Sequence, residues 1–227
     1  MIVTFEKGMA VRHIGHLDLM RAMQRALRRS GLPVRYSQGF NPHIQLSFAM
    51  PLSVGVVGER EIMDVPVEGN PDEEPFQRAL NAALPPCLQA SKVRAVPDEY
   101  PTLMALVAGS RLAIRMEPGE AADKVAAALD SFMASQECVT LRRTKSGEAM
   151  CNIRPFVKQA SAAQEEGGWV IRCVIENNPS GSLKPAVLMK ALCELSGMES
   201  VGFLASREAI LARDKSGALI PLEDYNG

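Results

Sequence analysis

The chain has 227 residues, of which 47% are hydrophobic and 22% are charged, a composition typical of a globular protein long enough for two domains. The net charge is −1, but residues 1–50 carry a net charge of +5 and residues 51–110 a net charge of −5. This distribution excludes a uniformly polybasic protein and indicates an anionic partner that binds near the basic end of the chain.

The cysteines and the hydropathy pattern exclude several further classes of protein. The five cysteines are scattered and form no Cys-x-x-Cys motif, which argues against a structural zinc site, an iron–sulfur cluster and a disulfide framework. No stretch approaches the ~20 consecutive apolar residues of a membrane span, and the first residues lack the pattern of a signal peptide. We expect a soluble, cytoplasmic protein with no metal, no other cofactor and no membrane partner.

The first half of the chain predicts an alternation of strands and helices. A β-rich run predicts a strand over residues 1–6, and an amphipathic pattern predicts a helix over residues 15–30 that Gly31 and Pro33 end. A short strand over residues 32–36 and a hairpin of residues 44–50 with residues 59–67 across Val57-Gly58 follow. A helix that starts at Asn70-Pro71 and stops at Pro85-Pro86 precedes a strand over residues 88–96. This order is the ferredoxin-like βαββαβ pattern.

The second half repeats the pattern with one extra strand after a proline-bounded connector at residues 97–101. We expect strands over residues 111–116, 138–143, 150–157, 169–175 and 201–204, helices over residues 118–134 and 182–195, a turn at Lys145–Gly147 and a flexible loop over residues 161–168. The predicted fold is therefore α+β, with two tandem ferredoxin-like (βαββαβ) domains. The first domain covers residues 1–97, the second covers residues 102–213, and residues 214–227 form a polar, loosely ordered tail.

Residues 12–48 hold all three histidines and six arginines against a single acid, Asp18. Helical phasing places a line of these arginines at i, i+4 and i+8 on the face opposite the apolar residues. Planar guanidinium groups suit phosphate, and the arrangement favours a bound anion because like charges at this spacing repel. The alternative is a solvated face whose arginines pair with acids elsewhere in the chain. The predicted anion-binding arginines are Arg12, Arg21, Arg25, Arg28, Arg29 and Arg35.

The loop that follows, YSQGFNPH over residues 36–43, gathers an aromatic, amides, a hydroxyl and an imidazole. An exposed Tyr36 or Phe40 would stack on a nucleobase while amide groups contact its edges. The alternative is an ordinary wide turn with both aromatic rings in the core. We add Tyr36, Gln38, Phe40, Asn41 and His43 to the predicted nucleic-acid-binding residues.

The histidines allow two kinds of chemistry. His13 and His16 lie three residues apart at a helix start, where Asp18 or His43 would join them as metal ligands. A metal-free pair of histidines would instead act as general acid and base beside an arginine-held phosphate. His16 also falls near the apolar side of the helix, which favours a core role. The catalytic candidates are His13, His16, Asp18 and His43.

A specific set of residues between positions 5 and 67 also matches a known family pattern. These residues are Lys7, Gly8, Arg12, His16, Leu17, Asp18, Arg21, Arg25, Arg28, Arg29, Leu32, Pro33, residues 36–42, Ser47, Phe48, Pro51, Leu52 and Gly55, with Arg154-Pro155 and Lys184-Pro185 as looser matches. With them the chain resembles the radical-SAM-linked family of bacterial proteins, a domain of unknown function. It departs from that pattern at Gly15, where a serine is usual.

The resemblance implies a partner and an RNA substrate. Members of that family are fused to, or encoded beside, a large radical SAM protein with a cobalamin-binding-like region, often near an RNA-processing ribonuclease. Because the chain lacks the CxxxCxxC cluster motif, the radical chemistry implied by the resemblance would belong to the partner.

We therefore predict an accessory protein that binds tRNA or rRNA and works with a partner radical SAM enzyme in RNA modification, without catalytic activity of its own. The first alternative is a metal-independent RNA-processing or RNA-modifying enzyme that uses His13, His16 or His43. The second alternative is a protein–protein scaffold for the radical SAM partner.

Overall fold

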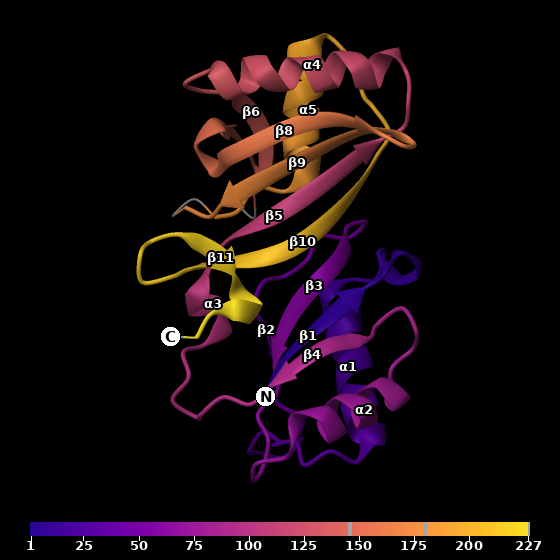
Figure 1. The fold of residues 1–227 in the computed structure, drawn as a ribbon, viewed down its shortest axis with the longest axis vertical. Coiled ribbons are helices and arrows are strands. Elements are labelled where there is room, and N and C mark those ends of the chain that lie inside the picture. The colour runs from indigo at the N-terminus through magenta and orange to yellow at the C-terminus, as the bar shows by residue number, and fades with distance from the viewer. Residues whose placement is uncertain (145–146, 179–180, 227) are drawn as a thin grey trace. The chain divides into compact units, whose positions relative to one another are not determined.

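The computed structural model describes residues 1–144, 147–178 and 181–226, which form two compact units. Unit 1 comprises Met1–Ala108 with Arg207–Gly227, and unit 2 comprises Gly109–Ser206. The protein is α+β, with mostly antiparallel strand pairs and five α-helices in the described residues (Figure 1). The predicted α+β class is confirmed. The division differs from the predicted one, because unit 1 takes in the 97–101 connector and the C-terminal residues.

Unit 1 is a sheet with the strand order β4-β1-β3-β10, in which β2 also pairs with β3 and β11 with β10. β1 lies between two antiparallel partners, so that Val3 stands opposite both Met63 and Val93. The elements of unit 1 are β1 (Ile2–Lys7), the 3-10 helix η1 (Met9–Val11), α1 (His16–Ser30), β2 (Ser47–Phe48), β3 (Val57–Asp64), α2 (Glu73–Ala83), β4 (Ala90–Arg94), α3 (Leu103–Leu106), the later part of β10 (Phe203–Arg213), β11 (Leu219–Pro221) and the 3-10 helix η3 (Leu222–Asp224).

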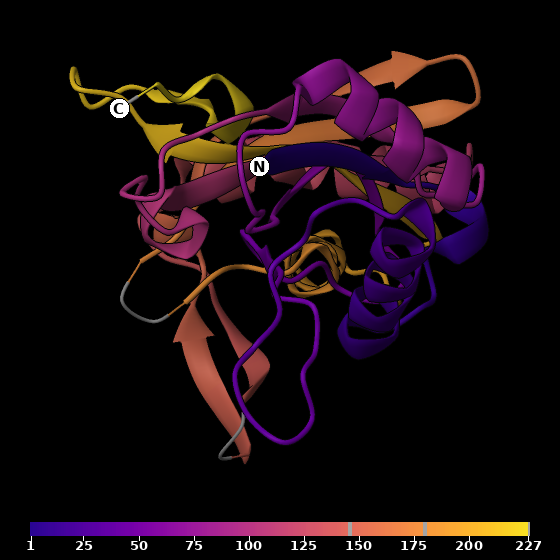
Figure 2. The ribbon, with the colours of Figure 1, turned by 90° about the horizontal axis from the view of Figure 1, so that it is seen from below.

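Successive residues of β1 face opposite sides of this sheet, and each side has its own core. Val3 and Phe5 are fully buried and join the apolar faces of α1 and α2. Ile2 joins a second core that includes Ile62 of β3 and Leu222 of η3. Figure 2 shows α1 in indigo and α2 in purple near the indigo strand β1. Both helices are therefore anchored to the sheet by their apolar stripes.

The helix α1 forms as its sequence predicts. Its four buried residues, Leu19, Met23, Ala26 and Leu27, recur with helical spacing. The helix ends at Gly31, whose φ of +68° lies in the left-handed region that glycine adopts without steric cost. The opposite face is left to the arginines.

Two other elements of unit 1 differ from prediction. The helix α2 begins at Glu73 after Asp72 rather than at Asn70-Pro71. The expected hairpin across Val57-Gly58 has a longer connection, because β2 covers only Ser47–Phe48 and residues 49–56 separate it from β3. Pro51 lacks a backbone N–H for strand pairing, and Gly55 has a φ of +86°, so both residues interrupt an extended strand.

The C-terminal residues also differ from the expected loose tail. β11 pairs with β10 over residues 211–213, and Leu222 is only 1% exposed in the second core. Glu223 accepts a hydrogen bond from Arg60 of β3, with 2.7 Å between Nη1 and Oε1. Because most residues of this segment are polar, its composition does not predict the burial of Leu222 or the ion pair beside it.

Unit 2 is built on the antiparallel strands β5, β9 and β8, with the helices α4 and α5 packed against each other. A separate hairpin, β6-β7, pairs Val139 with Asn152 and Leu141 with Met150. The elements are β5 (Val107–Met116), α4 (Glu120–Ala134), β6 (Val139–Thr144), β7 (Gly147–Asn152), the 3-10 helix η2 (Arg154–Phe156), β8 (Val157–Glu165), β9 (Gly168–Glu176), α5 (Pro185–Ser196) and the first residues of β10.

The prediction of a flexible loop over residues 161–168 is wrong. β8 runs through Glu165 and pairs with β9 to the Glu165–Gly168 end of the hairpin. Small and polar residues predict weak strand propensity here, but pairing with the hydrophobic strand β9 overrides it. Of the predicted turn at Lys145–Gly147, residues 145 and 146 lie outside the described residues. The last predicted strand covers residues 201–204, whereas the strand in the structure, β10, covers Phe203–Arg213.

Candidate nucleic-acid interface

The exposed face of α1 carries four arginines that differ in their hydrogen-bond and ion-pair partners. Arg25 and Arg28 are exposed and have no side-chain hydrogen bond or ion pair within residues 1–144, 147–178 and 181–226. Arg21 pairs with Asp18 at 3.1 Å, but both side chains are about two-thirds exposed, so the pair contributes little to stability. Two guanidinium groups on this face are therefore available to an external anion.

The remaining predicted arginines are held by other parts of unit 1. Arg29 donates from Nη2 to the carbonyl oxygen of Ala83, 2.6 Å away, at the last residue of α2. Arg12 donates to the carbonyl oxygen of Met9 at 2.9 Å, and Arg35 pairs with Asp98 at 3.0 Å. The sequence pattern predicts the same role for all six arginines, whereas the structure distinguishes them by their partners.

The loop of residues 36–44 is closed by its own hydrogen bonds. Tyr36 and Ile44 form an antiparallel bridge, and the Ser37 N–H donates to the His43 carbonyl oxygen at 2.9 Å. The Ser37 hydroxyl lies 2.8 Å from His43 Nδ1 and accepts the His43 backbone N–H at 3.1 Å. Serine and histidine thus fasten the two sides of the loop.

Both aromatic residues of this loop lie at the surface. Phe40 is fully exposed and Tyr36 is 43% exposed, so the alternative that both rings are in the core does not hold. Gln38 and Asn41 are exposed as well. An exposed aromatic ring flanked by amide groups is the arrangement that stacks on a single-stranded base.

Gln24 joins the arginine helix to the loop. Its Nε2 donates to the carbonyl oxygen of Ile44 at 3.0 Å. Arg28 lies four residues after Gln24 and therefore on the same side of α1. The free arginine and the base of the loop are consequently neighbours in unit 1.

The three histidines are not brought together. His13 is exposed beside Gly55, and the ring of His16 packs edge-on against Phe48 with 5.3 Å between centroids. His43 is held by Ser37 in the loop. Among the described residues, no three His, Cys, Asp or Glu side chains are grouped so that they would hold a metal ion. The expected core contact of His16 is present, and each of the three histidines has a different neighbour.

Unit 1 contains a buried ionic cluster that the sequence does not predict. Arg207 and Glu61, which are 3% exposed or less, form a two-point pair with distances of 2.7 Å and 2.5 Å. Lys7 is 1% exposed and donates to the carbonyl oxygen of Arg12 at 3.0 Å. Burial lowers the pKa of Lys7, and the charge of Glu61 opposes that shift. Pairing between residues so distant in sequence leaves no local signal.

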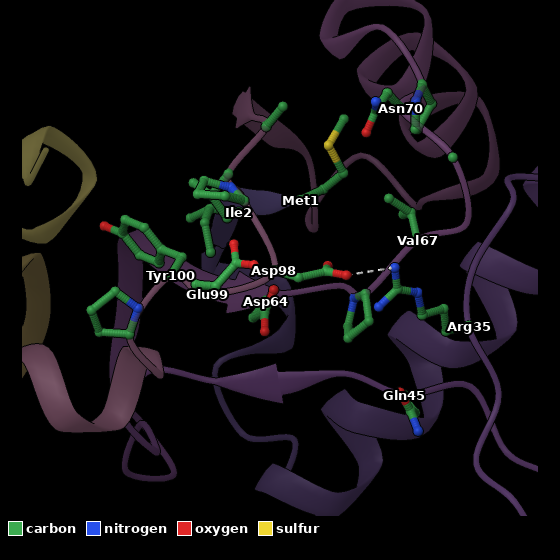
Figure 3. Close-up of a pocket in the computed structure, with 17 residues that line it drawn as sticks. Met1, Ile2, Arg35, Gln45, Asp64, Val67, Asn70, Asp98, Glu99 and Tyr100 are labelled. Atoms are coloured by element: carbon green, nitrogen blue, oxygen red, sulfur yellow. Dashed lines mark hydrogen bonds and ion pairs between the residues drawn. The ribbon is translucent and has the colours of Figure 1, made fainter. Parts of the chain in front are cut away.

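A cavity of about 550 Å³ opens beside the loop and was not predicted either (Figure 3). Arg35 and Gln45 line it, together with Asp64 at the end of β3 and Asp98 and Glu99 of the connector. Burial raises the pKa of Asp64, and the negative charge of Asp98 adds to the increase. Because these residues lie far apart in the sequence, only the folded chain brings them to one place.

The fold and site together define a mixed α+β protein with an exposed arginine helix beside a polar, aromatic loop. By sequence, the chain belongs to the family of uncharacterized proteins conserved in bacteria (DUF2344), whose family model matches residues 1–185. None of the curated proteins matches the chain. One similar solved structure is an unknown protein from Galdieria sulphuraria, which is 13% identical over 91% of this chain and 96% of that chain, with a TM-score of 0.26.

The described helices include none that is long and apolar enough to span a bilayer.

Proposed function

We propose that this protein binds structured RNA, tRNA or rRNA, through the exposed face of α1 and the loop of residues 36–44. The observation that carries the proposal is the pair of guanidinium groups of Arg25 and Arg28, which have no partner among the described residues and lie on the helix beside a loop with an exposed Phe40. Arginine forks bind phosphate through paired hydrogen bonds, and an exposed ring offers a stacking surface. Backbone attraction and base stacking together are the usual means of binding RNA loops.

We further propose that the protein is a cytoplasmic accessory to a radical SAM enzyme that modifies the bound RNA. This part rests on the resemblance of residues 5–67 to the radical-SAM-linked family. In that arrangement the chain presents RNA, and the partner supplies the radical chemistry.

The ferredoxin-like architecture also belongs to the proposal. In unit 1, β1, α1, β2, β3, α2 and β4 follow the βαββαβ order, and in unit 2, β5, α4, β8, β9, α5 and β10 follow it with the hairpin β6-β7 inserted. An experimental structure in which β2 does not pair with β3 would contradict the assignment for unit 1.

RNA binding is tested by fluorescence anisotropy with labelled bulk bacterial tRNA at a fixed, moderate salt concentration. Arg25→Ala with Arg28→Ala should weaken binding by about tenfold or more, because two phosphate contacts are lost. The matched control is Arg78→Ala with Lys124→Ala, which removes the same charge from residues that are paired with Glu74 and Glu120. Equal affinities of the two double variants would contradict the proposal.

A second candidate function, an RNA-cleaving enzyme, is favoured by one observation. The Ser37 hydroxyl lies within hydrogen-bonding distance of His43 Nδ1, the geometry of a hydroxyl beside a general base. Incubation of purified protein with bulk tRNA should then release fragments, and His43→Ala should abolish them. Intact tRNA after incubation would eliminate this candidate.

A further inference from the structure

The cavity beside the loop is placed to receive part of a ligand that the loop holds. Arg35 and Gln45 immediately flank the bridge between Tyr36 and Ile44, and both line the cavity. The Gln45 N–H donates to the Arg35 carbonyl oxygen at 2.9 Å, which fixes these two residues side by side. An RNA strand bound on the loop would therefore lie next to residues that line the cavity.

Figure 3 shows how the polar groups of the cavity are arranged. Asp64, Asp98 and Glu99 all line the cavity, and the guanidinium of Arg35 meets Asp98 across a dashed contact. That contact is 3.0 Å and uses only one Arg35 nitrogen, Nη2. The cavity thus offers both carboxylate acceptors and the remaining guanidinium donors of Arg35.

The charge of the cavity selects against phosphate. Its lining carries three carboxylates, those of Asp64, Asp98 and Glu99, and the guanidinium of Arg35. A phosphate would add negative charge to a lining that is already negative, whereas Arg25 and Arg28 on α1 attract it. The cavity is therefore suited to an uncharged part of a nucleic acid, and a volume of about 550 Å³ falls within the ordinary range for a small-molecule site.

We propose that this cavity accepts one unpaired guanine base of the RNA, a proposal that rests on the RNA-binding function above. Guanine presents two adjacent N–H donors, at N1 and N2, which one carboxylate accepts together, and two acceptors, O6 and N7, which suit a guanidinium. Adenine and cytosine each present a single amino donor beside acceptors, and uracil presents one N–H between two carbonyl groups. Asp64 is the carboxylate that accepts from guanine, and Arg35 is the donor.

The test uses hairpin RNAs with identical stems and seven-nucleotide uridine loops whose central base is guanine, adenine, cytosine or inosine. All four probes carry the same phosphates, so differences in affinity report the base alone. The guanine hairpin should bind about tenfold more tightly than the adenine or cytosine hairpin, a difference of the size that one base contact gives. Inosine, which lacks the N2 amino group, should fall between them.

Two variants separate the cavity from the arginine helix. Asp64→Asn should remove the preference for guanine, because an amide has one acceptor oxygen where the carboxylate has two. Arg25→Ala with Arg28→Ala should weaken binding of all four and keep the preference for guanine. The inosine comparison needs no change in the protein, so it tests recognition of guanine even if a variant fails to fold.

The outcomes distinguish the two proposals. Equal binding of the four hairpins by the wild-type protein would overturn the guanine site and leave RNA binding in place. Failure to bind both the hairpins and bulk tRNA would overturn RNA binding and the guanine site together. A preference for guanine that survives Asp64→Asn would overturn the role of Asp64 in the site.

Discussion

At the scale of single residues, the arginines of residues 12–35 differ in their hydrogen-bond and ion-pair partners, and their spacing in the sequence does not predict this difference. Helical phasing predicts which side of α1 they occupy, because the apolar residues fix the buried side. It does not predict that Arg29 reaches the end of α2, since Ala83 lies 54 residues away in the sequence. The guanidinium groups that are available to a ligand can be identified only when the partners of the other arginines in the folded chain are known.

Arg29→Ala should lower the free energy of unfolding by about 1 kcal/mol, because it removes a cationic donor from the C-terminal carbonyl groups of α2. Arg28→Ala, an exposed change without such a partner, should alter it by less than about 0.5 kcal/mol. Urea unfolding of both variants checks the prediction. Equal losses would show that the bond between Arg29 and Ala83 contributes nothing.

Lys7 should make stability depend on alkaline pH. Burial holds its pKa below the usual value of 10.5, so the folded protein releases this proton before the unfolded chain does. The free energy of unfolding therefore rises with pH between the lowered folded pKa and 10.5, and below that window the full cost of the buried charge is present.

The Lys7→Met variant has no ammonium group at this position, so its free energy of unfolding should lack this increase with pH. The free energy of unfolding of the wild type relative to the variant should thus grow as the pH rises toward 10.5, as measured by urea unfolding at each pH. A relative value that stays constant or falls over this range would show that the ammonium group is not destabilised by burial.

At the scale of elements, prediction succeeds where one short stretch contains its own signals. The helix α1 and its end at Gly31 follow from apolar spacing and from glycine's access to positive φ. Prediction fails for β8, whose polar edge residues become a strand only because β9 is beside them. The composition of residues 36–43 predicts a loop, but it does not predict the closure of that loop by Ser37 and His43.

The pair of Glu61 and Arg207 couples β3 to β10 inside unit 1. Removing one partner leaves a buried charge unpaired, so Arg207→Ala should cost about 3–5 kcal/mol of unfolding free energy. Glu61→Ala with Arg207→Ala should cost clearly less than the two single changes added together. A double-mutant cycle by urea unfolding measures the difference, and strict additivity would show that the side chains do not interact.

At the scale of the whole molecule, unit 1 is assembled from both ends of the sequence, which no linear reading of composition would indicate. Residues 219–224 look like the end of a polar tail, yet they complete the second core of this unit. The proline-bounded connector at residues 97–101 reads as a domain boundary, yet it lines the cavity of the candidate site. Long-range packing thus decides both the domain division and the position of the cavity.

Leu222→Ala should therefore destabilise the protein by about 2–5 kcal/mol, as expected for a buried leucine. Met104→Ala, at a residue that is 68% exposed, is the control and should change the free energy of unfolding by less than about 0.5 kcal/mol. Thermal or urea unfolding checks both. A neutral Leu222→Ala would mean that residues 214–226 are not part of the core.

The central claim, that Arg25 and Arg28 bind RNA phosphates, is tested most directly by the salt dependence of tRNA binding. For the wild type, the logarithm of the association constant should fall linearly with the logarithm of salt concentration. Arg25→Ala with Arg28→Ala should reduce the magnitude of that slope by about 1.4–1.8, the contribution of two phosphate contacts. A slope and an affinity equal to those of the wild type would contradict the claim.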